Sequence, residues 1–146
     1  MLMKTRFFHL VAQARQNIFR SADQLMTAKL EVTGTQVMAL FAIKSAEGCQ
    51  LKDLTRLLLL KNSAVTGLVS RMEQNGLIER RPCASDGRAS RLYISEHGTA
   101  VVAQAQPLMG VINRQLQQGF TDAELAIVAR FLNHAMRVNF TEESAQ

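Results

Sequence analysis

The sequence predicts a mainly α-helical fold that carries one small β-hairpin, and three observations lead to that prediction. Apolar residues recur at steps of three and four over much of the 146-residue chain, which is typical of amphipathic helices. Two short amphipathic segments follow each other closely in residues 51–75. Strand-like segments then flank the turn dipeptide Asp86-Gly87. Two short helices joined by a turn and followed at once by a hairpin form a winged helix-turn-helix.

The first element is a long helix over residues 4–30. Its apolar stripe is formed by Phe7, Phe8, Val11, Ala14, Ile18, Phe19, Ala22, Leu25 and Met26. Thr33-Gly34-Thr35 interrupts this pattern, and Thr35 is expected to cap the N-terminus of a second helix. That second helix is expected to end at Glu47-Gly48.

Residues 51–58 predict a short amphipathic helix with leucines on its apolar side. Lys61-Asn62-Ser63 interrupts it, and either Asn62 or Ser63 is able to cap the helix that follows. The apolar face of that following helix is formed by Val65, Leu68, Val69 and Met72. Asn75-Gly76 predicts its end, because glycine adopts the left-handed conformation after a helix without steric cost.

Residues 77–83 and 91–94 predict the two strands of the hairpin. Ser95 is expected to cap a long helix that runs to about Gln118. Pro107 should kink or break this helix, because proline removes a backbone hydrogen bond.

A last helix is expected after Thr121, which forms a capping box with Glu124 three residues later. One side of this helix carries Leu125, Val128, Leu132 and Met136. The chain contains no internal repeat and no low-complexity tract, so the helices and the hairpin are expected to form a single domain of residues 1–146.

The charge distribution points to a polyanionic partner. The net charge is +5, and residues 52–91 hold eight Lys or Arg against four acids. Residues 96–146 hold five acids and three bases. A basic excess concentrated in one segment is what a polyanion-binding surface requires. Aromatic residues are scarce and Trp is absent, which argues against base-stacking surfaces for single-stranded nucleic acid.

Other classes of protein are disfavoured by what the sequence lacks. No apolar run approaches the roughly 20 residues that span a bilayer, and no signal-peptide pattern is present, so we expect a cytoplasmic protein without a membrane partner. Cys49 and Cys83 match no metal-binding spacing, and His9, His97 and His134 lie far apart. No nucleophile–base pattern or phosphate-binding glycine loop occurs. We therefore expect no enzyme activity, no cofactor and no metal site.

Two stretches resemble the MarR family of winged-helix transcription regulators. LTRLLLLKNSAVTGLVSRMEQNGLIER, residues 54–80, follows the family's helix, turn and recognition helix without insertion. DGRASRLYISEHG, residues 86–98, is similar to the family's wing, second strand and helix start. The resemblance covers about residues 33–98 and implies that this part binds DNA. The flanking helices, about residues 4–30 and 96–140, are similar only in length and position, and the resemblance implies that they form a homodimer.

The resemblance implies a sequence-specific double-stranded DNA-binding transcription regulator that occupies a pseudo-palindromic operator. A repressor released by a small aromatic or amphipathic effector is the expected form. The alternative is a winged-helix protein-interaction module without specific DNA binding. The sequence lacks a proline that the family often has after the cap, and it departs from the family pattern at three further positions. Gly87 replaces the first wing arginine, Leu59 replaces a turn glycine, and Gly67 stands where a larger polar or basic side chain is frequent.

A recognition helix reads base edges in the major groove, and Lys and Arg neutralise phosphates. The candidates off the apolar face of the recognition helix are Ser63, Ala64, Thr66, Gly67, Ser70 and Arg71. Arg71 is able to bind guanine through two hydrogen bonds, to bind phosphate, or to pair with Glu73 or another acid. The alternative is that this side of the helix is an ordinary solvated surface without DNA contacts.

The wing supplies the second group of candidates. Arg88 is expected in the minor groove, where a guanidinium is attracted by the negative potential. Asp86 is expected to hold the tip of the hairpin through loop amides or Arg88. Arg81 and Arg91 are interpreted, with Arg80, as either phosphate contacts or ordinary charges on the strand surface.

Overall fold

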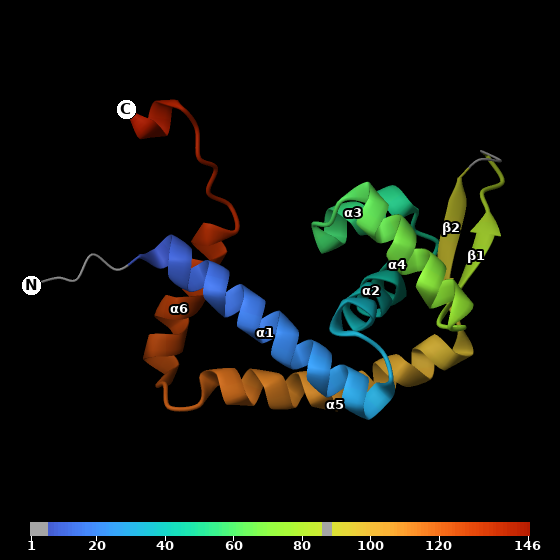
Figure 1. The fold of residues 1–146 in the computed structure, drawn as a ribbon, viewed down its shortest axis with the longest axis horizontal. Coiled ribbons are helices and arrows are strands. Elements are labelled where there is room, and N and C mark those ends of the chain that lie inside the picture. The colour runs from blue at the N-terminus through green and yellow to red at the C-terminus, as the bar shows by residue number, and fades with distance from the viewer. Residues whose placement is uncertain (1–5, 86–88) are drawn as a thin grey trace, which may run out of the picture. The chain divides into compact units, whose positions relative to one another are not determined.

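Helices account for most of the chain in a computed structural model that describes residues 6–85 and 89–146 (Figure 1). The elements are α1 (Phe7–Leu30), α2 (Gly34–Ser45), α3 (Leu51–Leu58), α4 (Asn62–Gln74), β1 (Ile78–Pro82), β2 (Ser90–Ile94), α5 (Glu96–Gln117), α6 (Asp122–Ala135) and the 3₁₀ turn η1 (Glu143–Ala145). This order confirms the predicted fold class, a mainly α protein with a β-hairpin wing. The chain divides into two units, Met1–Met109 and Gly110–Gln146.

The cap of α2 differs from the expected one. The prediction of Thr35 is wrong, because Thr33 is the N-cap and its side-chain oxygen accepts a hydrogen bond from the Gln36 amide at 3.1 Å. The Gln36 side chain accepts in return from the Thr33 amide at 3.1 Å. This reciprocal capping box needs Gln or Glu three residues after the cap, and Met38 stands there for Thr35.

The turn between α3 and α4 is made by Leu59, which has a φ of 54° and ψ of 39° and ends α3 in the left-handed conformation. Lys61 then becomes the N-cap of α4 without a side-chain hydrogen bond, and its carbonyl accepts from the Val65 amide at 3.1 Å. The expectation that Asn62 or Ser63 caps α4 is therefore wrong. Both residues lie inside the first helical turn, because the chain already enters α4 directly after the left-handed turn.

The core of the first unit is formed by apolar side chains, one face of each surrounding helix packing inward. The largest fully buried side chains are Met26, Val37, Leu40, Ile43, Leu54, Val65, Val69, Met72, Leu77, Leu92 and Val102. Burying a side chain of this size contributes about 1.5–3 kcal/mol. Because α4 buries Val65, Val69 and Met72, its opposite face is fixed toward the outside.

The hairpin follows α4 directly, as predicted. Gly76, at a φ of 72°, ends the helix, and β1 and β2 pair antiparallel with Arg81 opposite Arg91. The connection between α2 and α3 adds a short rung to this sheet, because the Leu92 amide donates to the Cys49 carbonyl at 2.8 Å. The base of the wing is thus bonded to the segment that leads into the helix-turn-helix.

The start of α5 is bonded to the end of α4. The Ser95 hydroxyl accepts from the Gly98 amide at 2.9 Å, as expected of a cap, and donates to the Gly76 carbonyl at 2.5 Å. A Cβ at position 98 would overlap the carbonyl oxygen of Leu77, so only glycine fits this contact. The predicted break at Pro107 is wrong, since α5 continues through this residue to Gln117.

In the second unit, α6 begins with the predicted capping box. The Glu124 amide donates to the Thr121 hydroxyl oxygen at 3.2 Å, and the Thr121 amide donates to the Glu124 carboxylate at 3.0 Å. No side chain of α6 is buried within the chain. The exposed apolar side chains of this unit include Ile127, Val128, Phe131, Leu132 and Met136. No helix in the described part of the chain is both long and apolar enough to cross a membrane.

Candidate nucleic-acid interface

The six residues predicted for base recognition share one side of α4. Ser63, Ala64, Thr66 and Arg71 are exposed, and Gly67 and Ser70 are half-buried. Since the other side of the helix forms core, these side chains can face only outward. The helix thus presents a narrow polar surface made almost entirely of small residues.

Two side chains on this surface have definite geometry. The Thr66 hydroxyl donates to the carbonyl of Asn62 at 2.9 Å, so its proton is used within the helix and its oxygen remains able to accept. Arg71 carries the only positive charge in α4. Its predicted alternative partner, Glu73, pairs instead with Arg80, at 3.6 Å between carboxylate and Nε. Among the described residues, no ion pair of Arg71 is found within 4 Å.

The arginines on the two strands of the hairpin have partners within the fold. The Arg81 guanidinium lies over the Tyr93 ring, 4.2 Å from its centroid, and pairs with Glu79 at 3.2 Å. Arg91 donates from Nη1 to the Gly48 carbonyl at 2.9 Å. These contacts hold the two arginines on the stem of the hairpin while leaving further guanidinium donors for other groups.

The tip of the wing contains the remaining predicted residues. Asp86 and Arg88 lie outside the residues that the structure describes, together with Gly87. Their roles at the hairpin tip remain predictions from the sequence. The strands on either side of these residues are Ile78–Pro82 and Ser90–Ile94.

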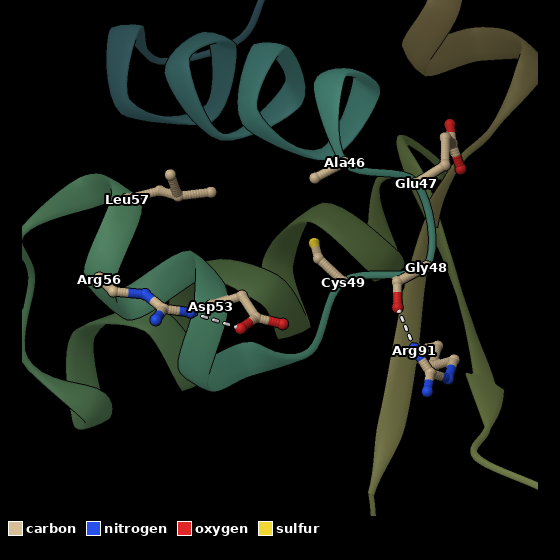
Figure 2. A pocket seen from close by; sticks show the side chains of 8 residues that line it. All are labelled: Ala46, Glu47, Gly48, Cys49, Asp53, Arg56, Leu57 and Arg91. Carbon is tan, nitrogen blue, oxygen red and sulfur yellow. Dashed lines mark hydrogen bonds and ion pairs between the residues drawn. The ribbon is translucent and has the colours of Figure 1, made fainter.

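An open hollow of about 420 Å³ lies beside the hairpin, between α3 and the loop before it (Figure 2). Arg56 and Asp53, both on α3, line this hollow and pair at 2.7 Å, and Arg91 of β2 lines it from the hairpin. The backbone amide of Gln50 donates to Asp53 and, with the charge of Arg56, holds the pKa of this carboxyl below its usual range. The hydrogen bond between Arg91 and Gly48 joins residues 43 positions apart, so no local sequence pattern indicated it.

Cys49 lies in the same hollow and is nearly buried. Burial, followed by the negative charge of Asp53, raises the pKa of its thiol. Cys83 is buried in the stem of the wing, 3.2 Å from the Ser85 hydroxyl. Within residues 6–85 and 89–146, no group of three or more His, Cys, Asp or Glu side chains is placed to hold a metal ion.

Comparison with known proteins identifies this arrangement. Residues 30–89 match the MarR family. The organic hydroperoxide resistance transcriptional regulator of Bacillus subtilis is 31% identical over 84 residues, which are 58% of this chain and 57% of that protein. The match thus spans little more than half of that relative's length.

The fold extends the similarity over nearly the whole chain. A mutant of MarR from Escherichia coli complexed with operator DNA superposes with a TM-score of 0.82 at 23% identity, covering 90% of this chain and 94% of that one. BpsR of Bordetella bronchiseptica, whose DNA binding is regulated by 6-hydroxynicotinic acid, gives 0.79 at 22% identity, with 90% and 98% covered. The comparisons therefore show that residues 30–89 are similar to the MarR family and that nine-tenths of the chain shares the fold of these two proteins.

Proposed function

We propose that this protein is a sequence-specific double-stranded DNA-binding transcription regulator. The observation that carries the proposal is the outward face of α4, whose small polar residues and single arginine stand next to a hairpin with arginines on both strands. A B-DNA major groove admits an α-helix, and small side chains let its backbone approach the bases. The operator complex of the E. coli protein with the same fold supports this assignment.

The functional unit in this proposal is a homodimer. The N-terminal half of α1 exposes apolar side chains, among them Phe8 with 84% of its surface accessible and Phe7 with 56%. In the second unit α6 and its C-terminal end expose the apolar side chains of Ile127, Val128, Phe131, Leu132 and Met136. Exposed apolar surface on this scale marks an interaction site, and a second copy of the chain is the partner. Residues 1–146 then act as one MarR-like domain, with about residues 33–98 on the DNA.

A two-fold dimer places its recognition helices about 34–36 Å apart, one helical turn of DNA, and so selects a pseudo-palindromic operator. Occupying a promoter in this way represses transcription. A small aromatic or amphipathic effector releases the DNA if it binds better to a dimer with a different helix spacing, since only differential affinity shifts such an equilibrium. The ligand regulation of BpsR supports an effector of this kind.

The test is a titration of the protein with duplex DNA from its own promoter region at several salt concentrations. Affinity at physiological salt that survives competitor DNA is the expected result, together with a linear fall of log affinity with log salt. Binding that is weak, indifferent to sequence and abolished by salt would instead leave a protein-interaction module as the function.

The wing is tested by Arg88→Ala. We expect duplex affinity to fall more than about tenfold while the dimer stays intact, because a guanidinium in the minor groove is lost. Lys29→Ala removes one positive charge from the end of α1 and serves as the control. Equal affinities of Arg88→Ala and Lys29→Ala would remove the wing tip from the mechanism.

A further inference from the structure

Gly67 stands in the middle of the recognition helix, where glycine destabilises the helix relative to alanine. Because Gly67 has no side chain, it leaves space on the helix surface that the side chain of Arg71 occupies. A Cβ at position 67 would lie 3.3 Å from Nη1 of Arg71 and 4.0 Å from its Cζ. Helical side chains point toward the N-terminus and meet the residue four positions earlier, so the Arg71 guanidinium lies back over the bare backbone of Gly67.

The surroundings leave this guanidinium available for a ligand. Arg71 is exposed, and the nearest acid in sequence, Glu73, is paired with Arg80. The other side chains of the face are short, and the proton of the Thr66 hydroxyl is donated to the Asn62 carbonyl. On the outward side of α4, Arg71 therefore supplies the only cationic donors, and Gly67 sets where they lie.

We propose that Gly67 is a positioning residue for operator specificity. By leaving room for Arg71 along the helix, it directs the guanidinium at the O6 and N7 atoms of one guanine in each half-site. Arginine binds these two acceptors through a pair of parallel hydrogen bonds. The other three base-pair orientations do not present this pair of acceptors at the same place in the groove. A larger residue at position 67 would take this space and would read the DNA itself. The inference rests on the proposed DNA-binding function.

The experiment begins with the wild-type protein and a pool of randomised duplexes. We expect the recovered sequences to share a G·C pair in each half-site whose replacement by A·T weakens binding by roughly 5- to 150-fold, the range of a bidentate arginine–guanine contact. The ratio of the affinities for the G·C duplex and the A·T duplex measures this preference. Arg71→Ala should bring the ratio close to one, while the base preferences at other positions remain. Arg71→Lys should lower this preference without abolishing it, because an ammonium group can still donate to guanine but lacks the planar fork of a guanidinium.

Gly67→Ala tests the positioning role. The added methyl displaces the guanidinium, so the ratio at the same G·C pair should fall, and adding Gly67→Ala to Arg71→Ala should change that ratio no further. Gly110→Ala is the matched control. A Cβ there would lie 3.5 Å from Nη1 of Arg114, a similar but slightly wider approach on α5, outside the recognition helix. This control should leave every base preference unchanged.

The outcomes separate the two proposals. A wild-type protein that enriches no shared sequence would overturn the proposed function and the inference with it. A shared sequence that Arg71→Ala still prefers, or a loss of affinity that is equal for all sequences, would make Arg71 a phosphate contact and overturn the inference alone. An unchanged ratio in Gly67→Ala would overturn the positioning role of Gly67.

Discussion

Leu59 adopts a backbone conformation that is unfavourable for leucine. Its φ is 54°, and its side chain is 89% exposed, so little burial offsets the strain. The left-handed conformation costs a side-chain-bearing residue about 1–2 kcal/mol, whereas glycine adds only about 0.5–1 kcal/mol of conformational entropy to the unfolded chain. Leu59→Gly should therefore stabilise the protein by up to about 1 kcal/mol, measured by urea unfolding.

Leu57 provides the control for this prediction. It is also exposed, but it lies within α3, where the right-handed conformation suits leucine. Leu57→Gly should destabilise the protein by about 1 kcal/mol. If both variants were destabilised alike, strain at Leu59 would not be a feature of the folded state.

Cys49 predicts a dependence of stability on alkaline pH. Burial raises the pKa of its thiol, so the folded state holds the proton more tightly than the unfolded state. The stability from this group is fully present below the pKa of an unfolded cysteine, about 8.5, and is lost as pH rises through the folded value. Wild type should therefore lose more stability than Cys49→Ala between about pH 8 and 10.

Urea unfolding of the two proteins under reducing conditions measures this difference, because every other titrating group is common to both. Parallel pH profiles would show that the thiol is not held in its protonated form. The same protonation argues that Cys49 reacts slowly with oxidants, since the thiolate is the reactive species.

The contacts of single arginines could not be predicted from the sequence. The basic segment was evident, but Arg91 bonds to Gly48, 43 residues away, and Arg81 stacks on a residue of the opposite strand. Side chains of this length have many rotamers, and the choice among them depends on tertiary neighbours. For the same reason, the sequence could not predict that the Arg71 side chain lies over Gly67.

At the scale of the elements, the order and type of every predicted helix and strand were predictable, whereas their caps were only partly so. Gly76, Ser95 and the Thr121 capping box signalled boundaries that the structure contains. Both Thr33 and Thr35 were possible N-caps of α2. Thr33 is the cap because Gln36, three residues later, completes a capping box with it. Such a choice depends on a reciprocal hydrogen bond rather than on the preference of a single residue.

Pro107 shows how exposure changes the effect of a helix breaker. Proline leaves the carbonyl of the residue four positions earlier, Ala103, without its helical partner. Both residues are exposed, so water can satisfy that carbonyl. Helical continuity through Pro107 therefore depends on which side of α5 it occupies, and this was not evident from its position in the sequence.

The contact between α5 and Leu77, in the segment that joins α4 to β1, predicts opposite effects for two glycines of one helix. Gly98→Ala would push a methyl group into the Leu77 carbonyl and should destabilise the protein by about 1–3 kcal/mol or more. Gly110→Ala meets only the tip of Arg114 and should stabilise it by up to about 1 kcal/mol. Thermal unfolding compares them, and a stabilised Gly98→Ala would show that α5 and Leu77 are not in close contact.

For the whole molecule, the exposed apolar face of α1 predicts the oligomeric state. Phe8→Glu should convert the proposed dimer to a monomer, because a two-fold interface carries each substitution twice and would bury two carboxylates. Deleting the chain before Ala22 should have the same effect. Light scattering after size exclusion measures the mass, and Gln13→Glu, which adds the same charge to α1, is the control.

The point mutant keeps this prediction testable if the truncated chain fails to fold. Phe8 is largely exposed in the single chain, so Phe8→Glu leaves the core of the first unit untouched. A dimer that survives both changes would place the interface away from α1.

The bonds that join Ser95 to Gly76 and seat Gly98 against Leu77 have a consequence for the operator. They join the end of the recognition helix to the first turn of α5, so we expect the two to keep their relative orientation. One base pair inserted between half-sites turns one of them by roughly 34–36° around the DNA axis. Bending at this junction would break these contacts, so in the proposed dimer we expect DNA affinity to depend on the length of the spacer between the half-sites.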